Sequence, residues 1–306
     1  MQIRPEKKIR FIKAQSYAIG LAGAAVFVWL AVNTDQTGFS ATPVSLLGVP
    51  VIALLAYFYF RLRTRRWRRR AKLTAQPFPP QWKETLNKCV PFYRNLDDSE
   101  KRRFENDVRI FIDEQNIYGE RGAAVDDEVK VLIGASAAIL GFGLPEWEWP
   151  NLRDIVVYPA AFNEDYETGE GEHILGMVHH SGPIIFSQRD LKHGFKDPKD
   201  GLNVGLHELA HVMDMADGAA DGVPAGISWI AAAPWVKTVA DRLLKLRSGC
   251  CRKILRSYAA TDEAEFFAVA VEAFFENPAR LYEQDNELYE MLSEYFNQDP
   301  VNRLKE

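Results

Sequence analysis

Two histidines four residues apart, His207 and His211, enclose a glutamate in the stretch His-Glu-Leu-Ala-His. Apolar side chains recur at helical spacing around them, which predicts a helix over Leu202–Met215. Positions i and i+4 of a helix lie on one face, so both imidazoles can bind one ion. Zinc held in this way lowers the pKa of a bound water to about 7, and Glu208 can accept the proton. The alternative is a helix that carries two histidines by chance.

A hydrolytic zinc site of this kind needs a third protein ligand, and the first candidate is Asp217. It occupies the last position of the pattern HExxHxxGxxH, in which a glycine turns the chain after the second histidine. Asp214 stands where that glycine would be. Without glycine the helix does not turn sharply, which disfavours Asp217 as a ligand.

The second candidate is Glu265, on a later predicted helix over Asp262–Glu276. It stands next to Ala264 and before two phenylalanines, on a helix that must pack against the core. A carboxylate directed at a core needs a partner, and a cation is a good one. The alternative is structural, because Asp262 and Glu265 also fit a variant of the helix capping box.

Several motifs together resemble the Mlc titration factor A family of zinc peptidases, whose fold is similar to the protease domain of anthrax lethal factor. The first is the stretch from His207 to Asp214, HELAHVMD, and it is followed by Tyr258 and by Glu-Ala-Glu-Phe-Phe from Glu263. The resemblance covers roughly residues 77–300 and includes Val156–Pro159, Gly182–Ser187, Asp197–Gly201 and Asp221–Pro224.

The resemblance implies a role for each matching residue. His207, His211 and Glu265 would bind Zn²⁺, Glu208 would be the general base, and the Tyr258 hydroxyl would face the developing oxyanion. It implies a peptide or protein substrate, with peptidase or aminopeptidase activity on short peptides. Members of the family are also linked to sequestering a transcriptional repressor, so the alternative function is a regulatory binding protein at the membrane, with little or no catalysis.

Two further acidic residues share a helical face with the expected ligands. Asp214 lies three residues past His211, where it either accepts a hydrogen bond from the outer nitrogen of an imidazole or caps backbone near Gly218. Glu272 lies seven residues past Glu265, and we expect its partner on a neighbouring helix. The remaining histidines lie in polar surroundings and are expected at the surface or outside the ligand set: His173, His179, His180 and His193.

Two apolar runs near the N-terminus, about residues 16–33 and 44–60, are each long enough to cross a bilayer. Basic residues precede the first run and follow the second, whereas the short link between them carries only Asp35. This distribution predicts a transmembrane hairpin with both ends in the cytoplasm, and hence a two-span protein of the cell inner membrane whose catalytic domain is cytoplasmic. The alternatives are a cleaved signal peptide and a pair of buried core helices. A membrane hairpin is a departure from the best-known members of the family, which are soluble.

Charge is divided unevenly along the chain. Residues 1–74 contain 13 Lys and Arg against two acids, whereas the remainder contains 24 basic and 40 acidic residues, a net charge of −16. Such an acidic body argues against direct nucleic-acid binding, which depends on neutralising phosphates. The basic cluster Arg61–Arg70 also suits anionic lipid headgroups. The three cysteines form no disulfide framework, which indicates a reducing compartment.

The fold class expected is α+β: a mainly helical, zincin-like (gluzincin) metallopeptidase domain with a small sheet, preceded by the hairpin. A proline-rich linker, Ala75–Pro80, separates a membrane anchor over residues 1–74 from a metallopeptidase domain over 75–306. We expect Gly182–Phe186 to be the sheet edge that aligns an extended peptide. The other elements expected are a strand over Asp154–Tyr158 and helices over Ser99–Gln115, Val129–Leu140, Ala232–Leu246 and Glu287–Phe296.

Overall fold

The computed structural model describes residues 6–33, 42–149, 152–161, 176–178, 183–197, 200–227, 229–248 and 255–303. The chain forms two compact units, Gln2–Gln76 and Pro77–Glu306, and the boundary between them falls inside the predicted linker. Three of the histidines and two of the cysteines lie outside the described residues: His173, His179, His180, Cys250 and Cys251.

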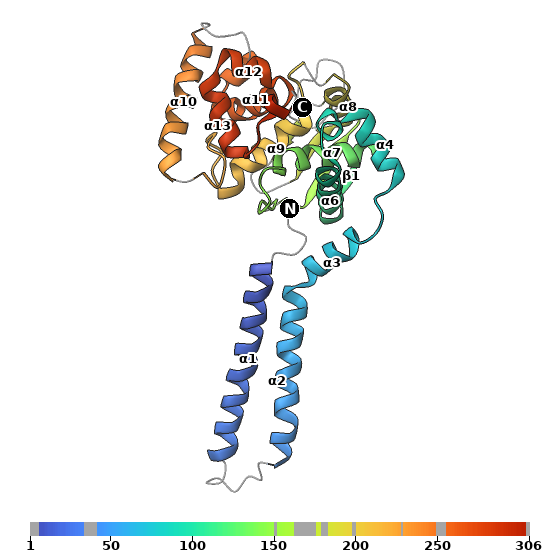
Figure 1. Cartoon of the computed structure of the whole chain (residues 1–306), viewed down its shortest axis with the longest axis vertical. Helices are drawn as coiled ribbons and strands as arrows, with labels where there is room; N and C mark the ends of the chain where they lie inside the picture. The colour runs from blue at the N-terminus through green and yellow to red at the C-terminus, as the bar shows by residue number, and fades with distance from the viewer. Residues whose placement is uncertain are drawn as a thin grey trace. The chain divides into compact units, whose positions relative to one another are not determined.

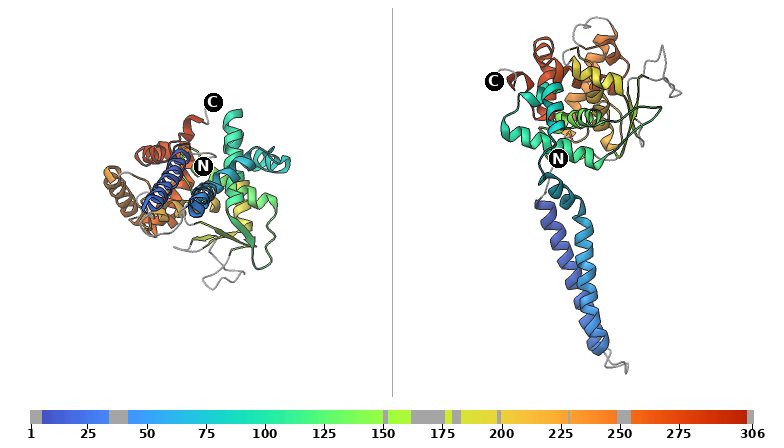
Figure 2. Two further views of the ribbon diagram at one scale, coloured as in Figure 1. Left: turned by 90° about the horizontal axis from the view of Figure 1, so that it is seen from below. Right: turned by 90° about the vertical axis from the view of Figure 1, so that its right-hand side faces the viewer.

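The first unit is a pair of antiparallel helices followed by a short one (Figures 1 and 2): α1 (Glu6–Asn33), α2 (Thr42–Arg63) and α3 (Arg65–Thr74). Gly23 of α1 lets the two long helices approach, because an added Cβ would overlap Ile52 of α2. Many large apolar side chains of α1 and α2 are exposed, among them Phe11, Leu21, Trp29, Leu54, Leu55, Phe58 and Leu62.

The two predicted membrane spans are not supported by this unit. Within the described residues, none of the helices combines the length and the apolar character that crossing a membrane requires.

The second unit is mainly helical, with one small sheet, which confirms the α+β prediction (Figure 1). Its longer helices carry the core and the candidate site: α6 (Asp98–Glu114), α7 (Asp127–Gly141), α9 (Val204–Asp214), α10 (Trp229–Arg247), α11 (Glu263–Glu276) and α13 (Asn286–Phe296). Shorter helices complete it: α4 (Pro80–Cys89), α5 (Pro91–Arg94), α8 (Gln188–Lys196), α12 (Pro278–Gln284) and α14 (Pro300–Arg303). Two 3₁₀ turns, η2 (Met215–Asp217) and η3 (Ser257–Ala260), follow α9 and precede α11.

The sheet has the strand order β1-β2-β4-β3. The strands predicted over Asp154–Tyr158 and around Pro183–Phe186 are confirmed as β2 (Asp154–Tyr158) and β4 (Ile184–Ser187). However, β4 pairs with β2 on one side and with β3 (Gly176–Val178) on the other, so the prediction that it forms the sheet edge is wrong. The edge beside β4 is β3, which runs antiparallel to it, and β1 (Asn116–Gly119) is the opposite edge.

The core of this unit is built around α7, whose residues from Val131 to Gly141 are all buried. Small residues on and against this helix allow close packing. A Cβ on Gly205 of α9 would overlap Ser136 of α7, so the two helices are almost in backbone contact. The other face of α9 lies against α11, which contributes Phe266 and Phe267 to the same core. Helix α9 is therefore packed between α7 and α11, which fixes the positions of its side chains.

Candidate metal centre

Helix α9 brings the two histidines together as the spacing predicts. It begins after Asn203, whose side chain accepts a hydrogen bond from Leu206 N at 3.1 Å. All eleven residues of the helix are buried, so His207 and His211 face the interior and not bulk water. The helix ends in η2, and Gly218 then adopts the left-handed conformation, with φ of 100°.

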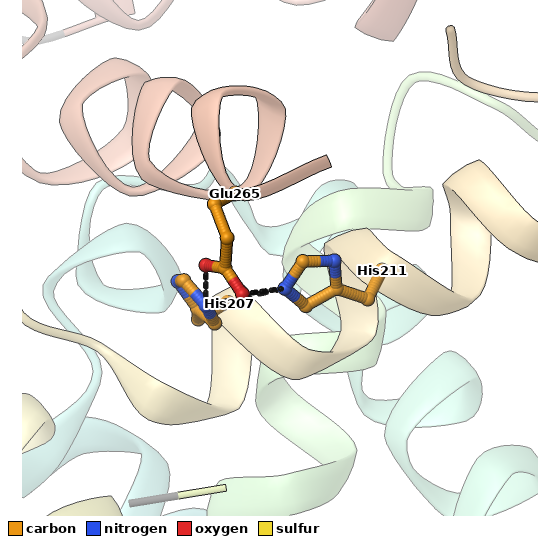
Figure 3. Close-up of side chains that lie close together, drawn as sticks. All are labelled: His207, His211 and Glu265. Carbon is orange, nitrogen blue, oxygen red and sulfur yellow. Dashed lines mark hydrogen bonds and ion pairs between the residues drawn. The ribbon is translucent and has the colours of Figure 1, made fainter. Parts of the chain in front are cut away.

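Glu265 approaches the two histidines from α11. Its main-chain N–H donates to Asp262 Oδ1 at 2.9 Å, which makes Asp262 the N-cap of the helix. The predicted capping role is therefore correct for the main-chain amide of Glu265, but its side chain does not cap the helix. The Glu265 carboxylate faces the imidazoles (Figure 3).

Three potential ligand atoms converge at one point. His207 Nε2 lies 3.1 Å from Glu265 Oε2 and 3.2 Å from His211 Nε2, and His211 Nε2 lies 3.5 Å from Glu265 Oε1. In a tetrahedral site with metal–ligand bonds of about 2.1 Å, ligand atoms are about 3.4 Å apart. The triangle formed by these three side chains has distances of that size, measured to both oxygens of Glu265. Within the described residues, this is the one group of His, Cys, Asp and Glu with metal-binding spacing.

The electrostatics of the triangle also fit a bound cation. Burial alone would lower the pKa of His207, but the carboxylates of Glu272 and Glu265 outweigh it and raise the pKa to about 10. Burial alone would raise the pKa of Glu265, but contacts with His207 and His211 hold it well below its usual range. The surroundings therefore favour positive charge between these side chains, which a metal ion supplies without a proton.

Glu208 lines a cavity of about 450 Å³ beside the triangle, with its side chain buried. Burial raises the pKa of Glu208, and the nearby histidines oppose that rise. Gly176 of strand β3 lies directly against this carboxylate, since an added Cβ would overlap the side chain of Glu208. The backbone of the edge strand therefore forms part of the wall next to Glu208.

Tyr258 lies in the η3 turn and is half exposed. Its hydroxyl donates to Glu265 Oε1 at 3.2 Å, and its ring centroid lies 6.0 Å from that of His207. Burial and the charge of Glu265 raise the pKa of Tyr258 to about 12, so the hydroxyl keeps its proton near neutral pH. The side chain is thus a hydrogen-bond donor at the open side of the triangle.

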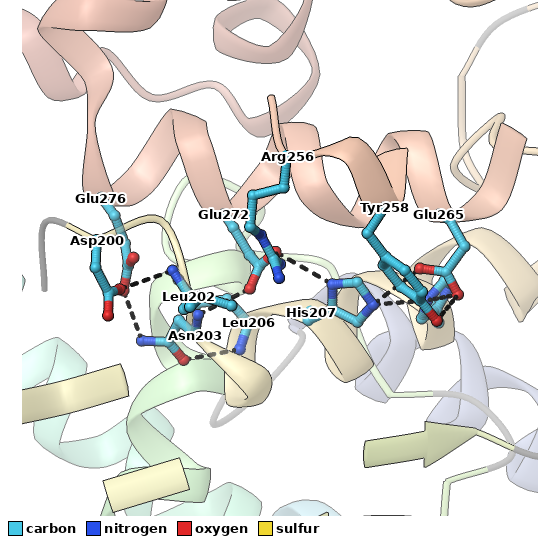
Figure 4. Close-up of polar contacts among 11 residues, drawn as sticks. Asp200, Leu202, Asn203, Leu206, His207, Arg256, Tyr258, Glu265, Glu272 and Glu276 are labelled. Carbon is cyan, nitrogen blue, oxygen red and sulfur yellow. Dashed lines mark hydrogen bonds and ion pairs between the residues drawn. The ribbon is translucent and has the colours of Figure 1, made fainter. Parts of the chain in front are cut away.

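Behind His207, a carboxylate holds the outer nitrogen of the ring (Figure 4). Glu272 Oε2 lies 3.2 Å from His207 Nδ1, which is the partner on a neighbouring helix expected for Glu272. The same carboxylate accepts hydrogen bonds from Asn203 N at 2.8 Å and from the guanidinium of Arg256. A carboxylate in this position fixes the tautomer and orientation of a liganding imidazole.

The other candidate side chains do not join the triangle. Asp214 is fully buried and accepts a hydrogen bond from Gly222 N at 3.1 Å. Within the described residues, no hydrogen bond joins it to an imidazole; Glu272 makes that contact, to His207. Asp217 accepts from Ala219 N at 3.1 Å and is not part of the metal-binding group. His193 is exposed and lies 3.8 Å from Asp200, at the cavity rim.

Sequence reasoning missed two residues of the site, Arg256 and Gly176. Arg256 is two residues before Tyr258, but nothing in its local sequence distinguishes it from a surface arginine. Gly176 lies in a three-residue strand, too short to produce an alternating pattern. A glycine before Met-Val was the only available signal, because glycine within a strand often marks a close backbone approach.

Comparisons with known proteins identify the family of this chain. A protein of Synechocystis that carries no functional name is 28% identical over 271 residues, covering 85% of this chain and 98% of that protein. Mlc titration factor A of Cronobacter sakazakii is 27% identical and that of Escherichia fergusonii 26%, each over 260 residues, 78% of this chain and 94% of the relative. Residues 64–297 match the family described as glucose-regulated metallo-peptidase M90. This match covers most of the chain and includes all three residues of the triangle, and the chain therefore belongs to that metallopeptidase family.

Proposed function

We propose that this chain hydrolyses peptide bonds with a Zn²⁺ ion held by His207, His211 and Glu265. The observation that carries the proposal is the triangle of these three side chains, whose imidazole nitrogens and carboxylate oxygens approach one another to 3.1 to 3.5 Å, next to a buried glutamate in a cavity. Two imidazole nitrogens and one carboxylate, with an open fourth position, are a typical ligand set for catalytic zinc.

The residues around the triangle have complementary roles. When bound, zinc would polarise the scissile carbonyl and lower the pKa of a water molecule to about 7. Glu208 accepts a proton from the attacking water and then delivers it to the leaving amine. Its raised pKa suits both steps, since a carboxyl that binds a proton more readily is a better base and remains able to release it. The Tyr258 hydroxyl donates to the oxygen on which negative charge develops.

The edge strand β3 is the proposed main-chain guide for the substrate. An extended peptide can add by backbone hydrogen bonds to the side of β3 that pairs with no other described strand. Gly176 then brings its backbone next to Glu208, so a peptide on β3 runs past the general base. We propose short peptides as substrates, with removal of N-terminal residues as the finer activity.

Asp214 is the proposed partner of the second histidine. Among the described residues, the buried atoms Asp214 Oδ1 and His211 Nδ1 have no hydrogen-bond partner, and the two residues are about one helical turn apart on α9. With zinc on its Nε2, His211 carries its proton on Nδ1 and is then a donor toward this carboxylate.

The hairpin α1–α2 is proposed to attach the protein to the inner membrane, with the catalytic unit in the cytoplasm. Exposed apolar side chains on both helices support attachment to lipid: Phe11, Leu21, Trp29, Leu54, Leu55, Phe58 and Leu62. The basic residues at the start of α1 and the end of α2 support the orientation. A reporter fused after Glu306 should behave as cytoplasmic in a membrane fraction; periplasmic behaviour would overturn the topology.

Metal analysis and a peptide-library digest test the enzymatic proposal directly. The purified full-length chain is expected to contain about one zinc per molecule and to cleave peptides, and a chelator should abolish cleavage. Adding zinc back should restore it. The cleavage positions distinguish removal of N-terminal residues from internal cleavage. A zinc-loaded, folded protein that cleaves no member of the library would contradict the proposal.

A second candidate function is favoured by the name of the relatives. They are called Mlc titration factor A, which describes proteins that titrate Mlc. For this chain we propose binding of a transcriptional regulator at the membrane as the alternative. Such binding uses a surface and not the triangle, so it should persist when catalysis is removed.

A further inference from the structure

We propose that Arg256 is a positioning residue, which holds Glu272 against His207 and thereby sets the affinity of the site for its metal. The inference rests on the proposed zinc site and extends it beyond the ligands. Arg256 precedes the η3 turn, and its guanidinium binds Glu272 Oε2, the oxygen that lies 3.2 Å from His207 Nδ1 (Figure 4). It is therefore two contacts away from His207, which is a proposed ligand of the metal.

Glu272 is held at both of its oxygens. Oε1 accepts from the main-chain N–H of Asn203, immediately before α9, while Oε2 faces both His207 and Arg256. The carboxylate is 1% exposed, so little water stabilises its charge. Burying a charged carboxylate is costly unless a cationic or hydrogen-bonding partner holds it. Arg256 is the cationic partner that holds this carboxylate in place beside the imidazole.

The charge balance of the site assigns the same role to Arg256. Three carboxylates act on His207: Glu208, Glu265 and Glu272. A divalent ion balances two of these negative charges and leaves the third. Arg256 is the one lysine or arginine among the described residues that line the cavity. It pairs with Glu272, the carboxylate that faces Nδ1 of His207 and not the nitrogen that points to Glu265.

A second arginine at the η3 turn provides a control that separates the contact with Glu272 from simple stabilisation of the turn. Arg256 holds its start, and Arg247 of α10 holds its end by donating to Ala260 O at 3.0 Å and to Thr261 O at 2.9 Å. Both arginines therefore secure the segment that carries Tyr258. Of these two arginines, Arg256 is the one that contacts Glu272. If the turn alone mattered, removing either arginine would have the same effect on the metal.

The test compares zinc affinity in Arg256→Met, Arg256→Lys and Arg247→Met, measured by competition with a chromogenic chelator on the full-length protein. Loss of a group that orients a liganding histidine typically costs 10- to 100-fold in metal affinity, so we expect a loss of about tenfold in Arg256→Met. Arg247→Met should bind zinc as the wild type does. Arg256→Lys should recover most of the loss, because lysine keeps the positive charge. The visible spectrum of the cobalt-substituted protein should change in Arg256→Met only.

A double variant tests the route through Glu272. In a Glu272→Gln background, Arg256→Met should cause no further loss of affinity, because the arginine acts through that carboxylate. Wild-type affinity in Arg256→Met, equal losses in Arg256→Met and Arg247→Met, or additive losses in the double variant would each overturn the inference. Zinc affinity is measured whether or not a peptide is cleaved, so failure of the proposed hydrolysis and failure of this inference are distinguishable.

Discussion

Replacing Glu208 with glutamine is expected to leave zinc bound and to lower peptide hydrolysis by about 10²- to 10⁴-fold, the usual contribution of a general base. Glutamine has nearly the same shape and fits the space between the cavity and Gly176, so the triangle should keep its geometry. Its amide cannot accept the proton of the attacking water. The measurement is kcat/KM on a cleaved peptide, with zinc content determined on the same preparation.

The matched control for this variant is Glu294→Gln, which changes an exposed glutamate of α13 and should leave kcat/KM unchanged. Full activity in a zinc-loaded Glu208→Gln protein would show that another group moves the proton. The same variant also separates the two candidate functions. A DNA-binding protein that co-purifies equally well with wild type and Glu208→Gln would support regulator binding independent of catalysis.

Glu265→Ala is expected to weaken zinc binding by more than about a hundredfold, and hydrolysis should fall with it. The substitution removes one of three ligands, whereas changes to groups behind the ligands typically cost only about 10- to 100-fold. It also removes the acceptor of the Tyr258 hydroxyl. Zinc per molecule after dialysis against a weak chelator measures the effect.

Glu263→Ala is the control for Glu265→Ala, since Glu263 is an exposed residue in the same first turn of α11. It should retain zinc at the wild-type level. Stoichiometric zinc in dialysed Glu265→Ala would mean that the third ligand lies elsewhere, and the carboxylate of Asp217 would then have to be reconsidered.

Local periodicity was sufficient to predict the helices of the site. The i, i+4 spacing places His207 and His211 on one face of α9, and the apolar pattern after Asp262 predicts α11. That the two helices pack together is a long-range fact that spacing cannot supply. The choice of Glu265 over Asp217 therefore depended on an argument about burial and on the resemblance, and the geometry of the triangle came only with the structure.

The incorrect predictions involve strands that are very short or contacts between residues that are far apart in the sequence. Strands β1 and β3 have four and three residues, so alternation is too brief to recognise, and without β3 the interior strand β4 looked like an edge. Asp214 and Glu272 both share a face with a ligand, and helical spacing alone does not say which of them meets an imidazole. Near the N-terminus, the length of two apolar runs predicted membrane-spanning helices that the described helices do not support.

The two uses of Glu265 have a consequence for the length of the chain around it. Its amide begins α11 through Asp262, while its side chain reaches α9, so the start of the helix and the direction of the carboxylate are set by the same residue. Each residue inserted or deleted between this cap and Glu265 would rotate the carboxylate by about 100° around the helix axis. The distance along the chain from Asp262 to Glu265 is therefore constrained as tightly as the identity of the acid itself, and homologous chains should differ here by substitution and not by insertion or deletion.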